Sequence, residues 1–345
     1  DKNIDAILIK SKSNKIYLGA LSGSGVKVLV TKDNLYQIMD GRYVNEAKNT
    51  TIDTNFEIIV HDQGQSYLSK VKELLQVDAI LGIEANQIFV KEYLNILDFG
   101  LHVELLENDL EQARKIKDDK EISLVAKACE ISDKIFMEAI KEVHIGMKEY
   151  ELSALLQYLA ISNGASGMAF DTIVASGVRG AMPHGRPTDK TFVEHECITI
   201  DFGITYQGYQ SDMTRTICIG EPTKEMEKIY DIVLEAQCAG VDFIKAGVKG
   251  RDVDKYVRNI ISSHGYGEYF THGLGHGMGM GDGELPVLNA RSETYLEDGM
   301  IMSCEPGIYI PNVGGVRIED DVLIKNEKGV ALNNTRKDMI KLEVK

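Results

Sequence analysis

The tightest constraint on the fold is a stretch in which every odd position from 273 to 283 is glycine. A helix is not expected there, because each glycine inside a helix costs about 1 kcal/mol relative to alanine. In an extended chain the glycines leave one face bare, so that another backbone or a ligand can approach closely. The opposite face carries larger side chains, those of His272, Leu274, His276 and Met278. Two histidines on one face are compatible with a metal site, although a single histidine is more often an ordinary hydrogen-bonded residue.

Two aspartates lie on either side of a predicted hairpin. The segments 198–203 and 211–216 are rich in β-forming residues and flank a Gln-Gly pair at 207 and 208. A two-residue turn there places Asp201 and Asp212 on one face as diagonal neighbours, with Cα atoms roughly 7–8 Å apart. Carboxylates aimed at one point repel each other unless a cation lies between them. The alternative is a pair of solvated aspartates, which the apolar run 197–200 before Asp201 disfavours.

Two glutamates follow apolar runs near the C-terminal end. Glu305 precedes a Pro-Gly turn, and Glu319 lies in a second apolar strand. A buried glutamate needs a partner, which is either an ion pair with Arg317 or a metal ion. The neighbouring thiol of Cys304 has no histidine in a supporting position, so a thiol nucleophile is disfavoured.

Taken together, these acidic residues and the histidine form a mixed oxygen and nitrogen set. Such a set suits manganese, cobalt, iron or zinc better than it suits soft metals. Four carboxylates balance the charge of two divalent ions, which in dinuclear sites lie about 3.5–4 Å apart.

Composition excludes several classes of function. The net charge is -15, and no basic stripe is present, so a nucleic-acid partner is not expected. The five cysteines form no C-x-x-C pair, which fits reduced thiols in a cytoplasmic protein. No apolar run approaches the roughly 18 residues of a membrane span, and the first residues contain no signal-peptide core. We therefore expect a cytoplasmic protein without a membrane partner.

The length of 345 residues suggests two domains. The first hundred residues alternate short strands with helical periodicity, which predicts a small α/β domain. A charge-dense segment begins near residue 110 and leads into an amphipathic helix that extends to about 145, followed by a further helix at about 224–245. We place the domain boundary near residue 110.

Several motifs in this order resemble those of the pita-bread metallopeptidases, the family of Xaa-Pro dipeptidase (prolidase) and aminopeptidase P. The matching runs are DFG at 201–203, SDMTRT at 211–216, HGLGHG at 272–277, EPGIY at 305–309 and RIEDD at 317–321. PHG at 183–185 and DGRY at 40–43 match further family motifs. The resemblance covers essentially the whole chain. It implies an α/β N-terminal domain of the creatinase type, residues 1–110, and an α+β C-terminal pita-bread domain, residues 111–345.

The resemblance also implies a function. The chain would be a metal-dependent exopeptidase that hydrolyses the Xaa-Pro bond of dipeptides or short peptides, using water activated by two divalent ions. Manganese is the first choice, with cobalt, zinc or iron as alternatives. The partners would be short proline-containing peptides and a second copy of the chain in a homodimer.

Individual roles follow from the motif positions. The metal ligands would be Asp201, Asp212, His276, Glu305 and Glu319. Among these, Asp212 and Glu319 would bridge the ions, and Glu305 would also act as the general base. His184 would stabilise the tetrahedral intermediate, while His272 and Arg317 would line or support the substrate pocket.

One position departs from the family. A second histidine usually stands seven residues beyond the histidine ligand, and Gly283 occupies that position here. The metal ligands are unaffected, but the rate and specificity are in question. A non-peptidase hydrolase or lyase on the same metal-binding scaffold is therefore the alternative. A binding protein without catalysis is a third possibility, although such relatives typically lose their ligands.

Overall fold

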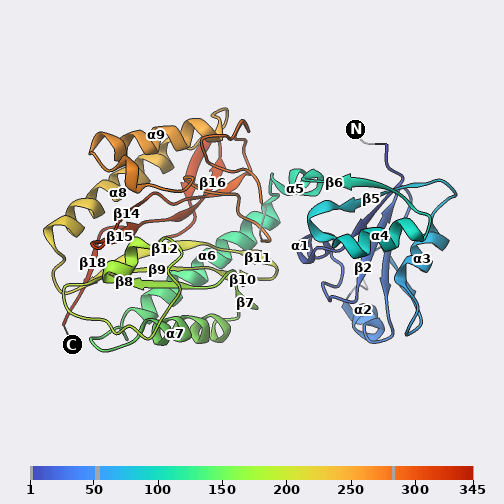
Figure 1. The fold of residues 1–345 in the computed structure, drawn as a ribbon, viewed down its shortest axis with the longest axis horizontal. Coiled ribbons are helices and arrows are strands. Elements are labelled where there is room, and N and C mark those ends of the chain that lie inside the picture. The colour runs from blue at the N-terminus through green and yellow to red at the C-terminus, as the bar shows by residue number, and fades with distance from the viewer. Residues whose placement is uncertain (1–2, 51–54, 282–283, 345) are drawn as a thin grey trace. The chain divides into compact units, whose positions relative to one another are not determined.

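A computed structural model describes residues 3–50, 55–281 and 284–344. The chain divides into two compact units, Asp1–Gln112 and Ala113–Lys345 (Figure 1). Within the described residues, no helix combines the length and the apolar character needed to cross a membrane.

The first unit is built on a mixed six-stranded sheet with the order β4-β3-β2-β1-β5-β6. Strands β1, β5 and β6 are parallel to one another, β3 and β4 are parallel, and β2 is antiparallel to both of its neighbours. The strands are β1 (Ala6–Ile9), β2 (Lys27–Thr31), β3 (Leu35–Met39), β4 (Phe56–Val60), β5 (Ile80–Glu84) and β6 (His102–Leu106). The helices are α1 (Lys12–Tyr17), α2 (Val44–Thr50), α3 (Tyr67–Leu74), η1 (Ala85–Gln87), α4 (Val90–Asp98) and α5 (Asp109–Arg114). The predicted small α/β domain is confirmed.

The second unit alternates long helices with short strands. Its helices are α6 (Asp119–Ala139), α7 (Glu149–Ser162), η2 (Gly177–Ala181), α8 (Lys224–Phe243), α9 (Gly250–Ser263) and η3 (Gly267–Tyr269). Its first strands are β7 (Gly167–Met168), β8 (Ile173–Ser176), β9 (Cys197–Phe202), β10 (Ile204–Tyr206), β11 (Tyr209–Gln210) and β12 (Met213–Ile219). The remaining strands are β13 (Ile301–Cys304), β14 (Gly307–Ile310), β15 (Gly314–Arg317), β16 (Asp320–Lys325), β17 (Lys328–Ala331) and β18 (Ile340–Leu342).

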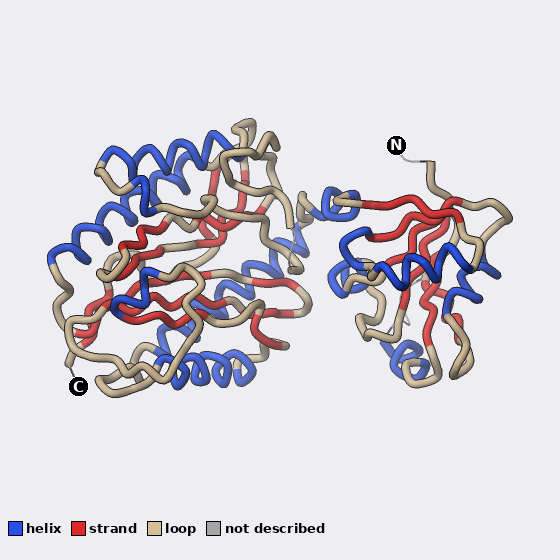
Figure 2. Tube along the Cα trace, in the orientation of Figure 1, coloured by secondary structure: helices blue, strands red, loops and turns tan. Residues whose placement is uncertain are grey.

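Two hydrophobic cores hold this unit together. Side chains from α6 and α7 pack against the sheet β18-β12-β9-β8 in one core. Side chains from α8 and α9 pack against β13, β14, β15 and β16 in the other. Figure 2 shows the strands of this unit between the two pairs of helices, which is the α+β arrangement expected for the C-terminal domain.

The long helix α6 begins at a capping box in which Asp118 and Glu121 bond to each other's backbone amides. It ends at Ala139, several residues before the predicted end near 145. Beyond this point the backbone makes tight turns, and they bring Val143 and Met147 into the hydrophobic core. Because these buried turn residues follow the helix directly, the apolar pattern of the sequence extends beyond the last helical residue.

The predicted hairpin is present with the predicted register. Tyr206 pairs with Tyr209, and φ is positive at Gln207 and Gly208, at 48° and 90°, as in a type I′ turn. The same register continues between β9 and β12, where Thr214 is opposite Asp201. Asp212 is therefore a diagonal neighbour of Asp201, as the turn predicts.

The glycine-rich segment is extended, and isolated bridges join Gly275 to Leu288 and Gly277 to Met302. A Cβ atom on Gly275 would lie 2.1 Å from the carbonyl oxygen of Ser303. The bare face is thus filled by neighbouring backbone. On the other face Leu274 packs into the hydrophobic core, so the larger side chains do not all share one environment. Gly283 lies outside the described residues.

Candidate metal centre

A cavity of about 1060 Å³ lies in the second unit. All of the residues predicted to have a role in the site line this cavity: Asp201, Asp212, His276, Glu305, Glu319, His184, His272 and Arg317. The ligand candidates come from separate elements, in or beside β9, β12, β13 and β16 and in the extended glycine-rich segment. Pairing between strands is therefore what brings residues together that lie far apart in the sequence.

Three of the predicted ligands converge most closely. Asp212, His276 and Glu319 each offer a ligand atom, and these atoms all lie within 4.8 Å of one another. Glu305 is also near, with Oε1 3.6 Å from His276 Nε2, the same distance that separates His276 Nε2 from Asp212 Oδ2. These four side chains thus face one region of the cavity.

Asp201 has a different neighbour. Its Oδ2 lies 2.5 Å from Nη2 of Arg317, and both side chains are buried. The ion pair of Arg317 is therefore with Asp201, rather than with one of the glutamates as the alternative interpretation of the sequence had it. The other carboxylate oxygen of Asp201, Oδ1, is buried without a hydrogen-bond partner among the described residues.

The electrostatics of the site favour a cation. Burial, together with the nearby charges of Glu319 and Asp201, raises the pKa of Asp212 well above its usual value. Burial and the charge of Glu305 likewise raise the pKa of Glu319, and burial raises that of Glu305. Each carboxylate disfavours ionisation of the next because burial removes the water that would screen them. A divalent ion would relieve this repulsion.

The free donor atoms fit such an ion. Nδ1 of His276 lies 3.2 Å from the carbonyl oxygen of Gly277, which can only accept, so Nδ1 carries the proton. The lone pair of Nε2 then faces the carboxylates of Asp212 and Glu305, with which it cannot form a hydrogen bond. Oδ1 of Asp212 is buried and has no donor among the described residues. Imidazole nitrogen and carboxylate oxygen suit first-row divalent metals, so the residues present fit a metal ion.

A hydrogen-bonded chain links Asp201 through Arg317 and Tyr309 to His272. Arg317 Nη1 donates to Tyr309 Oη at 2.9 Å, and His272 Nε2 lies 2.8 Å from the same oxygen. His272 Nδ1 bonds to the carbonyl of Gly273, so Nε2 must accept from Tyr309. Burial lowers the pKa of His272 to about 4, which keeps the ring neutral at physiological pH. His272 and Arg317 are thus held in fixed orientations at the cavity wall.

His184 lies at the cavity wall just beyond η2 and is exposed. The carbonyl of the preceding residue, Pro183, accepts a hydrogen bond from Arg317 Nη1 at 3.2 Å. Arg317 therefore fixes the backbone that carries His184 while it also holds Asp201.

Three residues that the sequence did not single out support the ligands through hydrogen bonds. Tyr309 links Arg317 to His272, and Ser303 Oγ donates to Glu305 Oε1 at 3.2 Å. Thr214 Oγ1 donates to Glu319 Oε2 at 2.5 Å. All three lie within or beside the quoted motifs, but hydroxyl groups in β-strands carry no pattern that separates such a role from ordinary packing.

Fold and site together define a two-domain protein of the metalloenzyme class, with its candidate metal centre in the larger unit. The chain belongs to metallopeptidase family M24, whose model matches residues 123–326, and the model of the Creatinase/Prolidase N-terminal domain matches residues 1–116.

Relatives of known name support this membership. A Xaa-Pro dipeptidase of Pyrococcus horikoshii is 40% identical over 350 residues, which cover 99% of this chain and 96% of that protein. A Xaa-Pro dipeptidase structure from Bacillus anthracis superposes with a TM-score of 0.92 at 38% identity, covering 98% of this chain and 95% of that one. An X-Pro aminopeptidase structure from Thermotoga maritima has a TM-score of 0.90 at 35% identity, with 98% of both chains covered. The same fold thus occurs under both activity names.

Proposed function

We propose that this protein is a metal-dependent exopeptidase that hydrolyses the Xaa-Pro bond of dipeptides or short peptides. The observation that carries the proposal is the convergence of Asp212, His276 and Glu319 within 4.8 Å, inside a cavity that is large enough for a peptide. The names of the relatives favour peptide hydrolysis over a non-peptidase reaction on the same scaffold.

The metal centre is proposed to hold two ions, with manganese first and cobalt, zinc or iron as alternatives. The proposed ligands are Asp201, Asp212, His276, Glu305 and Glu319, with Asp212 and Glu319 in the bridging positions. When bound, such ions lower the pKa of water and stabilise negative charge on a carbonyl oxygen. The four acidic ligands supply a charge of about -4 against two divalent ions, and the raised pKa values of three of them are consistent with a cation requirement.

The protein's own side chains supply the remaining chemistry. Glu305 accepts the proton of the attacking water, a role consistent with a pKa that burial raises above its usual value. His184 donates an N–H to the developing oxyanion from the cavity wall. Arg317, which is buried, holds Asp201 in place, and neutral His272 lines the pocket for the substrate proline.

The wider assignments rest on the family and on composition. We propose residues 1–110 as the creatinase-like domain and 111–345 as the catalytic domain, with short proline-containing peptides as substrates. A homodimer in the cytoplasm is proposed in keeping with the family resemblance and with five cysteines that are all free thiols. Gly283 is proposed to lower the rate on Xaa-Pro substrates, because the family histidine at that position contacts the substrate near the scissile bond.

The decisive test compares a Xaa-Pro dipeptide with a Xaa-Pro-Xaa tripeptide, each with added Mn²⁺ and with chelator. We expect cleavage that requires metal, and the preferred length will distinguish a dipeptidase from an aminopeptidase. Bound metal without cleavage of either peptide would refute the proposed substrate class.

A matched pair of variants tests the assignment of the site. Asp212→Asn removes one anionic ligand oxygen and should abolish metal-dependent cleavage. Asp231→Asn makes the same change at an exposed position on α8 and should leave cleavage unchanged. Equal activity of the two variants would contradict the ligand assignment.

A further inference from the structure

Asp212 and Glu319, the two carboxylates assigned to the bridging positions, are linked by a reciprocal pair of hydrogen bonds. One bond reaches the carboxylate of Glu319, and the other reaches the backbone N–H of Asp212. Each one is contacted by the residue that stands two positions beyond the other. Thr214, two residues after Asp212, bonds to Glu319, and Asp321, two residues after Glu319, bonds to Asp212. The two short segments therefore hold each other.

Thr214 fixes the carboxylate of Glu319. Its Oγ1 donates to Glu319 Oε2 at 2.5 Å and accepts from Arg317 Nε at 3.1 Å. Because the guanidinium nitrogen can only donate, the hydroxyl proton must point to Glu319. The backbone adds a further link, since Glu319 N–H donates to the Thr214 carbonyl at 3.1 Å. Thr214 is fully buried, so no water competes for its hydroxyl.

Asp321 fixes the backbone of Asp212. Its Oδ2 accepts from the Asp212 N–H at 2.9 Å and from the Cys129 thiol at 3.2 Å. Its own N–H donates to Asn333 Oδ1 at 2.8 Å, which anchors the backbone of Asp321. Asp321 is fully buried and does not itself line the cavity. Its carboxylate therefore acts through Asp212 and not on a substrate.

Arrangements of this kind matter because a ligand must stay in place before a metal ion binds. The carboxylates of Asp212 and Glu319 repel each other, and a free glutamate side chain would turn away. Groups that orient metal ligands in other proteins typically change metal affinity or activity by about 10–100-fold when they are removed.

We propose that Thr214 and Asp321 are positioning residues that hold Glu319 and Asp212 in the geometry needed to bridge two metal ions. The inference rests on the proposed function and deepens it. Thr214 orients the carboxylate of one bridging ligand, and Asp321 orients the backbone of the other. Loss of either residue lowers the affinity for the metal pair, even though all five ligands remain.

The experiment titrates metal-free full-length protein with Mn²⁺ by calorimetry and records the electron paramagnetic resonance spectrum of the loaded protein. Thr214→Val removes the hydroxyl at nearly constant volume, and Thr214→Ser restores it. We expect the affinity for the metal pair to fall about 10–100-fold in Thr214→Val and to stay within about threefold of wild type in Thr214→Ser. The spectrum of a spin-coupled pair should give way to that of isolated ions only in the valine variant.

Asp321 provides a second pair of variants, which tests the inference even if the Thr214 variants do not fold. Asp321→Ala removes the acceptor for Asp212 N–H, whereas Asp321→Asn keeps an acceptor oxygen of the same reach. The alanine variant should lose about 10–100-fold in affinity and the asparagine variant about threefold or less.

Thr199→Val is the matched control. Thr199 is a buried threonine on the adjacent strand, two residues from Asp201, and its hydroxyl bonds to Thr216 and to the Gly315 carbonyl rather than to a carboxylate. The Thr199→Val variant should bind Mn²⁺ with the affinity of wild type. A wild-type affinity in Thr214→Val and Asp321→Ala, or an equal loss in Thr199→Val, would overturn the inference. Peptide cleavage by wild type is measured separately, so that a failure there refutes the proposed peptidase and leaves the comparison of metal affinities intact.

Discussion

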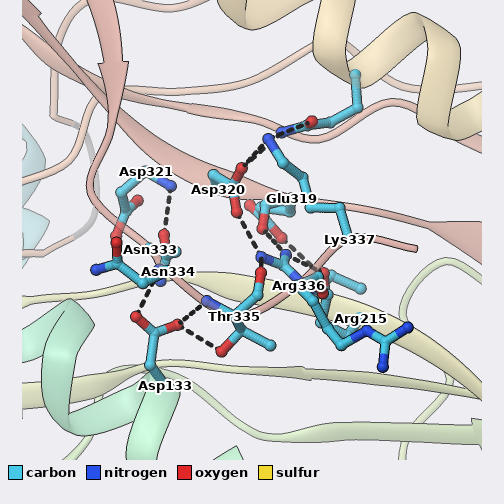
Figure 3. Close-up of polar contacts among 12 residues, drawn as sticks. Asp133, Arg215, Glu319, Asp320, Asp321, Asn333, Asn334, Thr335, Arg336 and Lys337 are labelled. Atoms are coloured by element: carbon cyan, nitrogen blue, oxygen red, sulfur yellow. Dashed lines mark hydrogen bonds and ion pairs between the residues drawn. The ribbon is translucent and has the colours of Figure 1, made fainter. Parts of the chain in front are cut away.

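Arg215 is the residue whose loss should cost the most stability near the metal centre. The side chain is 1% exposed and pairs with Asp320 at 2.6 Å. Its five N–H groups are all used: besides Asp320, they donate to the backbone carbonyls of Thr214, Glu319, Thr335 and Arg336 (Figure 3). One guanidinium thus joins β12, the start of β16 and the segment that follows β17.

The magnitude follows from what Arg215→Ala would leave behind. Asp320 would stay buried, with Lys337 Nζ at 2.8 Å and Gln237 Nε2 at 3.0 Å as its remaining partners. Breaking one side of a buried ion pair typically costs about 3–5 kcal/mol in the free energy of unfolding. For a unit of this size that loss corresponds to a fall in Tm of about 6–20 °C. Arg215→Lys keeps the charge without the planar fork, so its loss should be intermediate.

Arg336→Ala is the matched control because Arg336 lies beside the same cluster (Figure 3). Its side chain is 57% exposed and pairs with exposed Asp338, so its removal should cost about 0.5 kcal/mol or less. The backbone carbonyl that Arg215 uses remains in this variant.

The chain has no tryptophan, so differential scanning calorimetry is the better assay. The relevant transition is the one that added Mn²⁺ moves upward, since ligand binding stabilises the unit that contains the site. If Arg215→Ala and Arg336→Ala each lost less than about 1 kcal/mol in the free energy of unfolding, the reasoning that burial gives the Arg215 pair its value would be refuted.

Three further predictions concern the metal site. Burial raises the pKa of Asp321 to about 7, so its contribution to the stability of metal-free protein is complete below about pH 4 and is lost as the pH rises through 7. The Tm of chelated wild type should therefore fall more between pH 5 and pH 7 than that of chelated Asp321→Asn, and an equal fall would contradict this. Gly275→Ala places a Cβ 2.1 Å from the Ser303 carbonyl oxygen and should cost about 1–3 kcal/mol by calorimetry, whereas Gly167→Ala, with open space around its Cβ, should cost almost nothing. Gly283→His should raise kcat/KM on a Xaa-Pro dipeptide about tenfold or more, and unchanged turnover would show that the histidine is dispensable here.

Much of the fold could be predicted from the sequence because its signals are local. The Gln-Gly turn fixes the register of β9 and β12, and that register alone makes Asp201 and Asp212 diagonal neighbours. The alternating glycines exclude a helix and require close packing, which Gly275 provides against the Ser303 backbone. In each case a short-range rule on turn type or on side-chain volume determines a long-range contact.

The supporting contacts could not be predicted because they depend on pairing across the chain. The partner of Arg317 proved to be Asp201, which is distant in sequence, and not the adjacent Glu319. Similarly, the end of α6 at Ala139 depends on how Val143 and Met147 reach the core. Neither feature has a local signature, since both depend on which strand or core surface lies nearby in the folded chain.

The three consecutive acidic residues at 319–321 have different roles in the folded chain, although the sequence alone does not distinguish them. Successive side chains in an extended segment point to opposite faces. Glu319 lines the cavity and Asp321 reaches Asp212 on the same side, while Asp320 between them meets Arg215, Lys337 and Gln237 on the other. A metal ligand and its positioning residue thus share one face, and the residue that secures their strand faces the core.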